Sequence, residues 1–118
     1  MTTLAARIAG NPPLTLLAVF LLVLTLARIA ILVATPLNLG PDEAQYWSWS
    51  LTPAFGYFTK PPLIAWVIGA STAVCGDGEA CIRLSSPIFH GATALAVFFA
   101  GRALYDERIG VWSAVTYA

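Results

Sequence analysis

The sequence predicts an all-α, polytopic membrane protein fragment. Only 10% of the residues are charged and 58% are hydrophobic, whereas roughly 25% of the residues of a soluble domain are charged. The mean hydropathy is +0.78. Between Leu14 and Val33 every position is apolar except two threonines and Arg28, and about 20 helical residues cross a hydrocarbon core. We therefore expect two complete transmembrane helices, interfacial helices in the first outer loop and the start of a third transmembrane helix.

The apolar runs and the polar stretches between them divide the chain into six segments. The first run is too long for the core of a cleaved signal peptide, and Pro36 follows it instead of a cleavage site. The distribution of basic residues slightly favours a cytoplasmic N-terminus. The expected segments are a cytoplasmic lead (1–13), transmembrane helix 1 (14–34), an outer loop (35–83), transmembrane helix 2 (84–105), a cytoplasmic turn (106–108) and the start of transmembrane helix 3 (109–118).

Two apolar stretches are shorter than a membrane crossing. Residues 109–118 would cover about half of the bilayer, so we expect the chain to be the N-terminal part of a larger protein and to be inactive alone. Residues 62–74 would form about 20 Å of helix. That length suits an interfacial or re-entrant helix, whereas a crossing here would place every later segment on the opposite side of the membrane.

Two adjacent carboxylates, Asp42 and Glu43, follow the first apolar run. Pro41 suits the first position of a helix, so both acids would lie in its first turn, where the helix dipole keeps them ionised. Asp42 would share a face of this helix with Tyr46. One carboxylate could act as a general base that takes a proton from an acceptor hydroxyl or amine. The alternative is a capped helix start with interfacial aromatic anchors.

Two basic residues could complete a site beside these acids. Lys60, which precedes two prolines, could hold a lipid phosphate as a point charge, or it could extend toward the lipid headgroups. Arg28 lies roughly 7 Å inside the outer end of the first helix. It could extend outward in the same way, or it could meet Asp42 or Glu43 in the protein interior.

The remaining reactive side chains give weaker signals. Cys75 and Cys81 bracket a glycine-rich segment and could form a disulfide outside the cytoplasm, or remain free. His90 is expected to pack or to form a hydrogen bond, because no second metal ligand stands at a suitable spacing. The balanced charge argues against nucleic acid as a partner, and no glycine motif for nucleotide binding is present.

Three motifs occur together at a specific spacing. They are Pro41-Asp42-Glu43-Ala44-Gln45-Tyr46-Trp47, Gly56-Tyr57-Phe58-Thr59-Lys60-Pro61-Pro62-Leu63 and Arg83-Leu84. This combination resembles the GT-C membrane glycosyltransferases of the protein O-mannosyltransferase and aminoarabinose transferase type, in particular the bacterial RgtA/B/C/D-like branch. The similarity extends from about Arg28 to the last residue.

The resemblance implies an inverting glycosyltransferase that moves a sugar from a polyprenyl-phosphate donor to a lipid, glycan or protein acceptor. The active loop would face the periplasm from the bacterial inner membrane, in contact with membrane lipids. It implies Asp42 as the catalytic base and Lys60 as a ligand of the polyprenyl phosphate. Aminoarabinose transferases typically have a glutamate before this lysine, where it helps to bind a metal. Thr59 stands here, so a divalent metal stays an open alternative without support in this segment, and no cofactor is assigned.

The predicted site combines the residues from the motifs with those from the charge pattern. Its catalytic candidates are Asp42 and Glu43, its substrate-binding candidates are Lys60, Arg28, Tyr46 and Tyr57, and Cys75 and Cys81 are the candidate disulfide. No metal ligand is predicted. The alternative function is a non-catalytic membrane module, such as an assembly subunit or a transporter fragment, in which the acids and the lysine serve structure or substrate passage.

Overall fold

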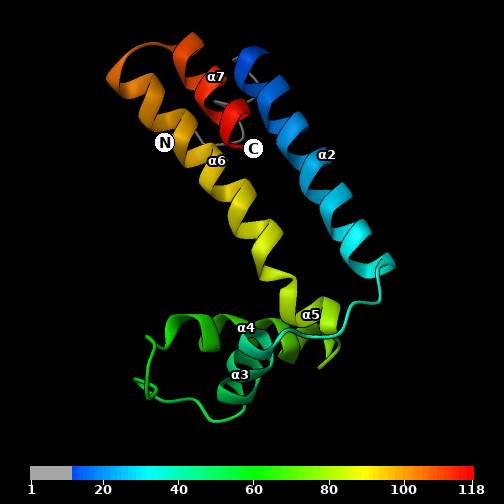
Figure 1. The fold of residues 1–118 in the computed structure, drawn as a ribbon. Coiled ribbons are helices and arrows are strands. Elements are labelled where there is room, and N and C mark those ends of the chain that lie inside the picture. Colours follow the sequence, from blue (N-terminus) through cyan, green and yellow to red (C-terminus); the bar gives the residue numbers. More distant parts are fainter. Residues whose placement is uncertain (1–11) are drawn as a thin grey trace. The chain divides into compact units, whose positions relative to one another are not determined.

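The computed structural model describes residues 12–118, and within this range all regular secondary structure is helical (Figure 1). The helices are α2 (Pro12–Ala34), α3 (Pro41–Ser50), α4 (Leu63–Cys75), α5 (Glu79–Arg83), α6 (Ser85–Leu104) and α7 (Glu107–Tyr117). Two stretches, Pro12–Ala34 and Glu79–Leu104, are long and apolar enough to cross a membrane, with mean hydropathies of 2.8 and 1.3. The all-α membrane fold predicted from the sequence is confirmed.

The helix bounds differ from the predicted segments at both polar ends. The predicted lead (1–13) lies outside the described residues except for its last two residues, both prolines, which begin α2. Proline suits this position, because an N–H group at the start of a helix has no partner within the helix. The predicted turn at 106–108 is shorter, because Asp106 caps α7 and accepts the backbone N–H of Ile109 at 2.7 Å. Glu107 and Arg108 consequently lie in the first turn of α7.

The chain is divided into two compact units, and each is described by itself. The described part of the first unit comprises residues 12–28 and 88–118, which supply most of α2, most of α6 and all of α7. Its core is formed by apolar side chains at helical spacing on the three helices. They are Leu14, Leu17, Leu21, Ala94, Phe98 and Ala114.

Helices α6 and α7 approach each other backbone to backbone. A Cβ atom built on Gly101 would lie 2.9 Å from the Cα of Gly110, which is closer than any side chain could pack. In a membrane, small residues at a helix contact let the two backbones approach and gain van der Waals energy that bulkier residues would prevent. The two glycines therefore set the distance between α6 and α7.

Replacing Gly110 with alanine is expected to destabilise the protein by about 1–3 kcal/mol, the usual cost of overpacking a close contact. The new Cβ would lie 2.7 Å from the carbonyl oxygen of Phe98 and 3.0 Å from the backbone nitrogen of Arg102, and neither atom can move without its helix. Thermal unfolding in detergent micelles measures the effect. Gly56→Ala is the matched control, because a Cβ at that position meets nothing within 4 Å. Equal melting temperatures for the two variants would contradict the prediction.

The second unit comprises residues 29–87 and contains α3, α4 and α5. Helix α3 packs against α4, and α4 packs against α5. Ala65, Ile68 and Ile82 are its buried apolar side chains. Helix α4 has 13 residues, shorter than the roughly 20 that a bilayer crossing needs. Its C-cap is Gly76, whose φ of 91° is a backbone conformation that residues with a side chain rarely adopt.

Candidate functional site

The two predicted acids lie in the first turn of α3, which begins at Pro41. The carboxylate of Glu43 turns back and accepts the backbone N–H of Gly40 at 2.8 Å, so it satisfies a donor that the helix itself cannot pair. Asp42 points elsewhere, and its side chain is 79% exposed. The neighbouring carboxylates therefore have different surroundings, and they can serve different purposes.

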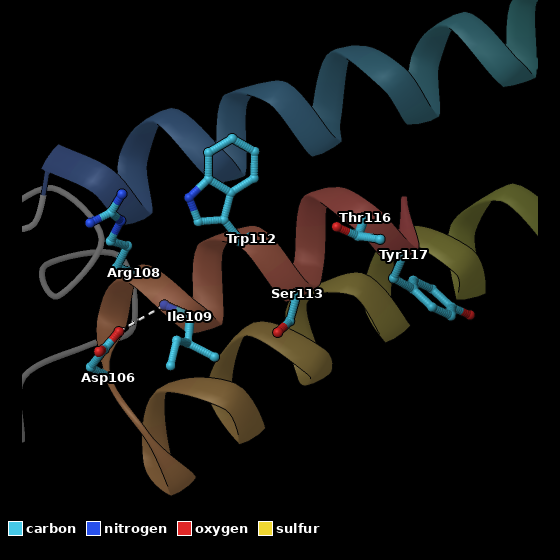
Figure 2. A pocket seen from close by; sticks show the side chains of 7 residues that line it. All are labelled: Asp106, Arg108, Ile109, Trp112, Ser113, Thr116 and Tyr117. Carbon is cyan, nitrogen blue, oxygen red and sulfur yellow. Dashed lines mark hydrogen bonds between the residues drawn. The ribbon is translucent and has the colours of Figure 1, made fainter.

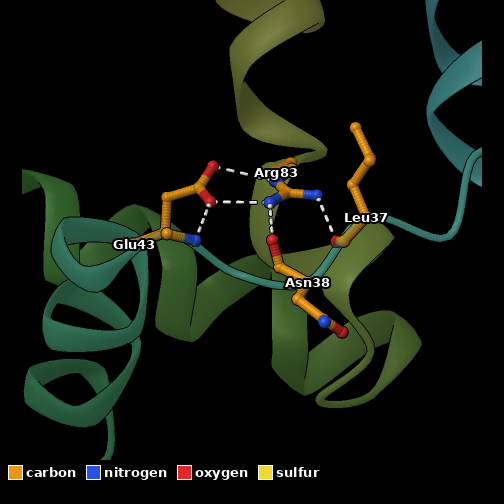
Figure 3. Close-up of polar contacts among 5 residues, drawn as sticks. Leu37, Asn38, Glu43 and Arg83 are labelled. Atoms are coloured by element: carbon orange, nitrogen blue, oxygen red, sulfur yellow. Dashed lines mark hydrogen bonds and ion pairs between the residues drawn. The ribbon is translucent and has the colours of Figure 1, made fainter.

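Arg83, at the end of α5, holds Glu43 in place (Figure 3). Its Nε and Nη2 atoms donate to the two carboxylate oxygens of Glu43 at 2.8 and 2.6 Å. The same guanidinium donates to the carbonyl oxygens of Leu37 and Asn38 at 2.9 and 3.0 Å. One arginine thus joins α5, α3 and the segment that leads into α3, with the planar two-point geometry that only arginine provides.

These contacts keep Glu43 ionised. The hydrogen bonds from Arg83, then the one from the Gly40 N–H and the charge of the guanidinium, lower the pKa of Glu43 from 4.5 to about 2. A carboxylate with so low a pKa and with donors on both oxygens is a poor proton acceptor at neutral pH. The arrangement therefore suits Glu43 to positioning α3.

Asp42, Lys60 and Tyr46 form the second polar cluster. The Lys60 Nζ atom lies 3.7 Å from an Asp42 carboxylate oxygen and donates a hydrogen bond to the Tyr46 hydroxyl at 2.5 Å. The Tyr46 hydrogen bond, and next the charge of Asp42, raise the pKa of Lys60, so the amine remains charged at neutral pH. Three of the predicted site residues are therefore brought together, with the carboxylate open to solvent beside a fixed positive charge.

The predicted substrate-binding residue Tyr57 shapes the connection between α3 and α4. Its ring stacks on Trp49 with the centroids 4.9 Å apart, and its hydroxyl lies 2.8 Å from the Trp49 carbonyl oxygen and 3.0 Å from that of Thr52. Trp66 of α4 donates its indole N–H to the carbonyl oxygen of Ala54 at 3.0 Å. These contacts order the segment that carries Lys60, and a contact of Tyr57 with substrate stays a prediction.

The predicted site residue Arg28 belongs to the first unit. Its guanidinium donates a hydrogen bond to the carbonyl oxygen of Ala118. In the same unit the His90 ring stacks on Tyr117, with the centroids 4.8 Å apart. The role of Arg28 in substrate binding stays a prediction.

Cys75 and Cys81 are joined by a disulfide, with their Cα atoms 6.0 Å apart. It links the last residue of α4 to the middle of α5. Between the cysteines, Asp77 accepts a hydrogen bond from the indole N–H of Trp47 at 3.2 Å. The loop is therefore fastened to α3 as well as closed on itself.

An open depression lies along α7 in the first unit (Figure 2). Its lining residues come from α7 and its cap: Asp106, Arg108, Ile109, Trp112, Ser113, Thr116 and Tyr117. None of them is a residue predicted for the site from the sequence. Within residues 12–118 no group of three or more His, Cys, Asp or Glu side chains is arranged to hold a metal ion. The cluster of Asp42 and Tyr46 on α3 with Lys60 from the following connection is the candidate site.

Sequence reasoning assigned no role to Arg83, although it forms the largest set of polar contacts around the acids. The motif Arg83-Leu84 was recognised, but its distance of 40 positions from Glu43 hid the pairing. A charge inventory could have revealed it. Lys60 and Arg83 are the only basic residues between positions 35 and 83, and the adjacent acids Asp42 and Glu43 require counter-charges.

The helical fold and the two membrane-length helices define an integral membrane protein, and its second unit carries a cluster of acid, tyrosine and lysine side chains. The profile of the dolichyl-phosphate-mannose-protein mannosyltransferase family matches residues 59–118. The chain belongs to this family, which confirms the resemblance to the GT-C membrane glycosyltransferases.

A relative is described as lipid A galacturonosyltransferase RgtD from Rhizobium johnstonii. It is 39% identical over 94 residues, which are 79% of this chain and 20% of the relative. The chain thus spans about a fifth of that protein's length. No solved structure matches the chain.

Proposed function

We propose that this chain supplies the acceptor-activating base and a donor-phosphate ligand of an inverting membrane glycosyltransferase. The donor is a polyprenyl-phosphate sugar. The observation that carries the proposal is the Asp42–Lys60 pair, an exposed carboxylate 3.7 Å from an ammonium group. The two groups have the charges that a transfer from a phosphate leaving group needs, and they stand beside each other on a membrane protein of the matching family.

Each group has one task in the proposed reaction. Asp42 takes the proton from the acceptor hydroxyl, and the freed oxygen lone pair forms the new bond to the anomeric carbon. The bond from that carbon to the phosphate oxygen breaks, and its electron pair leaves with the polyprenyl phosphate. Lys60 stabilises the negative charge on the departing phosphate. Attack from the side opposite the phosphate inverts the anomeric centre.

The proposal gives Glu43 and Arg83 a positioning role. Glu43 is held by Arg83 and by the start of α3, so it fixes the helix turn that presents Asp42. Tyr46 keeps Lys60 next to that turn through its 2.5 Å hydrogen bond. Enzymes lose rate steeply when a reacting group is displaced by as little as about 1 Å, so this support matters for the chemistry.

We propose a lipid A type of glycolipid as the acceptor, because the similar Rhizobium protein is described as a lipid A galacturonosyltransferase. The proposed location is the inner membrane, with residues 35–83 on the periplasmic side. The Cys75–Cys81 disulfide supports this side, because disulfides persist in oxidising compartments.

Transfer is measured in membranes of a gene-deletion strain, with and without the gene restored at its native locus. One result would overturn the proposal in favour of a non-catalytic module. It is that lipid A is the same with and without the restored gene and that no sugar is transferred from any of a panel of polyprenyl-phosphate donors.

Replacing Lys60 with alanine is expected to weaken donor binding by about tenfold or more, the usual effect of losing a charged hydrogen bond. The apparent donor affinity in a transfer assay measures this effect. Lys60→Arg retains the charge and should recover part of the affinity. Arg108→Ala removes a positive charge from α7 and serves as the control for a general loss of charge. An unchanged donor affinity for Lys60→Ala would remove the phosphate role of this residue.

A further inference from the structure

Helix α3 is fastened to the segment 77–83 at two points. Glu43 accepts two hydrogen bonds from Arg83, and Trp47 donates one to Asp77 at 3.2 Å. Glu43 and Trp47 are four positions apart, so they lie on one side of α3. The segment 77–83 therefore holds that side of the helix along a full turn.

The start of the segment has little intrinsic stability. Helix α5 has five residues and is separated from α6 by Leu84 alone, whereas residues 76–78 form no regular secondary structure. Gly76 and Gly78 flank Asp77, and glycine loses more conformational freedom on folding than any other residue. Something else must hold the segment in place.

The disulfide provides that restraint. It joins Cys75, the last residue of α4, to Cys81 in α5. Cys81 precedes Arg83 by two positions, and Asp77 lies inside the closed loop. A cross-link of this kind removes conformations from the loop that would otherwise compete with the folded one. Both attachment points of α3 are therefore on the cross-linked segment or directly beside it.

We propose that the Cys75–Cys81 disulfide and Asp77 are positioning elements for α3 and make the placement of the acid pair sensitive to reduction. Reduction by a dithiol transfers two electrons and two protons to the two sulfurs, which become thiols, while the reductant closes to its own disulfide. Arg83 and Asp77 then lose their fixed positions, and α3 loosens. The consequence for catalysis rests on the function proposed above, whereas the loosening of α3 does not.

Hydrogen–deuterium exchange of the amides of residues 42–50 tests the coupling without any assay of activity. The protein is taken in native membranes or detergent, first oxidised and then treated with dithiothreitol. We expect reduction, and equally the double variant Cys75→Ser/Cys81→Ser, to accelerate exchange by about fivefold or more, the effect of losing one or two net hydrogen bonds. Dithiothreitol should have no further effect on the double variant. Unchanged exchange in these residues would overturn the proposal, as would maleimide labelling of both cysteines in the untreated protein.

Substitutions of Asp77 separate a positioning role from general structural support. Asp77→Ala removes the acceptor of the Trp47 hydrogen bond and should accelerate exchange in α3. Asp77→Asn keeps an acceptor oxygen and should restore the slow exchange. In the transfer assay, Asp77→Ala should lower kcat more than it raises the donor KM, because Asp42 lies on α3 itself, whereas Lys60 lies in the connection after α3 and is linked to the helix through Tyr46. Equal exchange in Asp77→Ala and Asp77→Asn would remove Asp77 from the proposal. Faster exchange on reduction in a protein without transfer activity would support the coupling and overturn the proposed function alone.

Discussion

Asp42→Asn is expected to lower the rate of sugar transfer by at least about 100-fold, the usual contribution of a general base. Asparagine has nearly the same shape as aspartate but cannot accept the proton of the acceptor. The side chain of Asp42 is 79% exposed and its nearest charged partner is 3.7 Å away, so the loss of charge should cost little stability. Initial rates at saturating donor measure the effect, and limited proteolysis of intact membranes checks insertion.

The control for this variant is another acid in the same unit. Asp77→Asn also removes one negative charge, but it retains the acceptor for Trp47 and should leave the rate near that of the unmodified protein. Unmodified turnover by Asp42→Asn would exclude this residue as the base. A loss of rate in both variants would indicate that the charge of the unit or the Asp77–Trp47 contact, and not proton transfer to Asp42 alone, controls the rate.

Arg83→Ala is expected to lower the transfer rate by about 100-fold, because the acid pair would no longer be held in its productive position. The substitution removes four hydrogen bonds and leaves the Glu43 carboxylate without its positive partner. Arg83→Lys should recover little, since an ammonium group cannot bind a carboxylate and two carbonyl groups in one plane. The decrease should appear mainly in kcat, measured as the rate at saturating donor.

A double-mutant cycle tests whether Arg83 acts through Glu43. If Arg83 acts through Glu43, then Arg83→Ala combined with Glu43→Ala should be scarcely worse than Arg83→Ala alone. Arg102→Ala is the matched control, because this arginine makes a surface ion pair with Glu107 at 3.9 Å, and such pairs contribute little. Additive effects of the Arg83 and Glu43 substitutions would show that the two residues act independently.

The fold could be predicted because its signals are local. A run of apolar residues predicts the membrane-length helix α2, and Pro41 marks the start of α3 at the residue where the structure begins it. The cluster of Asp42, Tyr46 and Lys60 was predicted in part for the same reason, since helical spacing places Asp42 and Tyr46 on one face. The resemblance of the three motifs to a known protein family then assigned Lys60 to the same site.

The rest depends on contacts between distant positions. Arg83 reaches Glu43 across 40 positions, and Trp47 reaches Asp77 across 30. No periodicity or spacing rule connects such pairs, because loop geometry decides which side chains meet. The same limit applies to Arg28, whose guanidinium donates to the Ala118 carbonyl group, 90 positions away.

The contact of Gly101 with Gly110 has a practical consequence for handling the protein. Detergent tails can replace leucine side chains at a helix contact that those side chains form. They are too thick to enter between two helix backbones that are in direct van der Waals contact. The attraction there is short-range and owes nothing to exclusion of water. The hairpin of α6 and α7 should therefore survive solubilisation in short-chain detergents, which makes it the natural reference point when extraction conditions are compared.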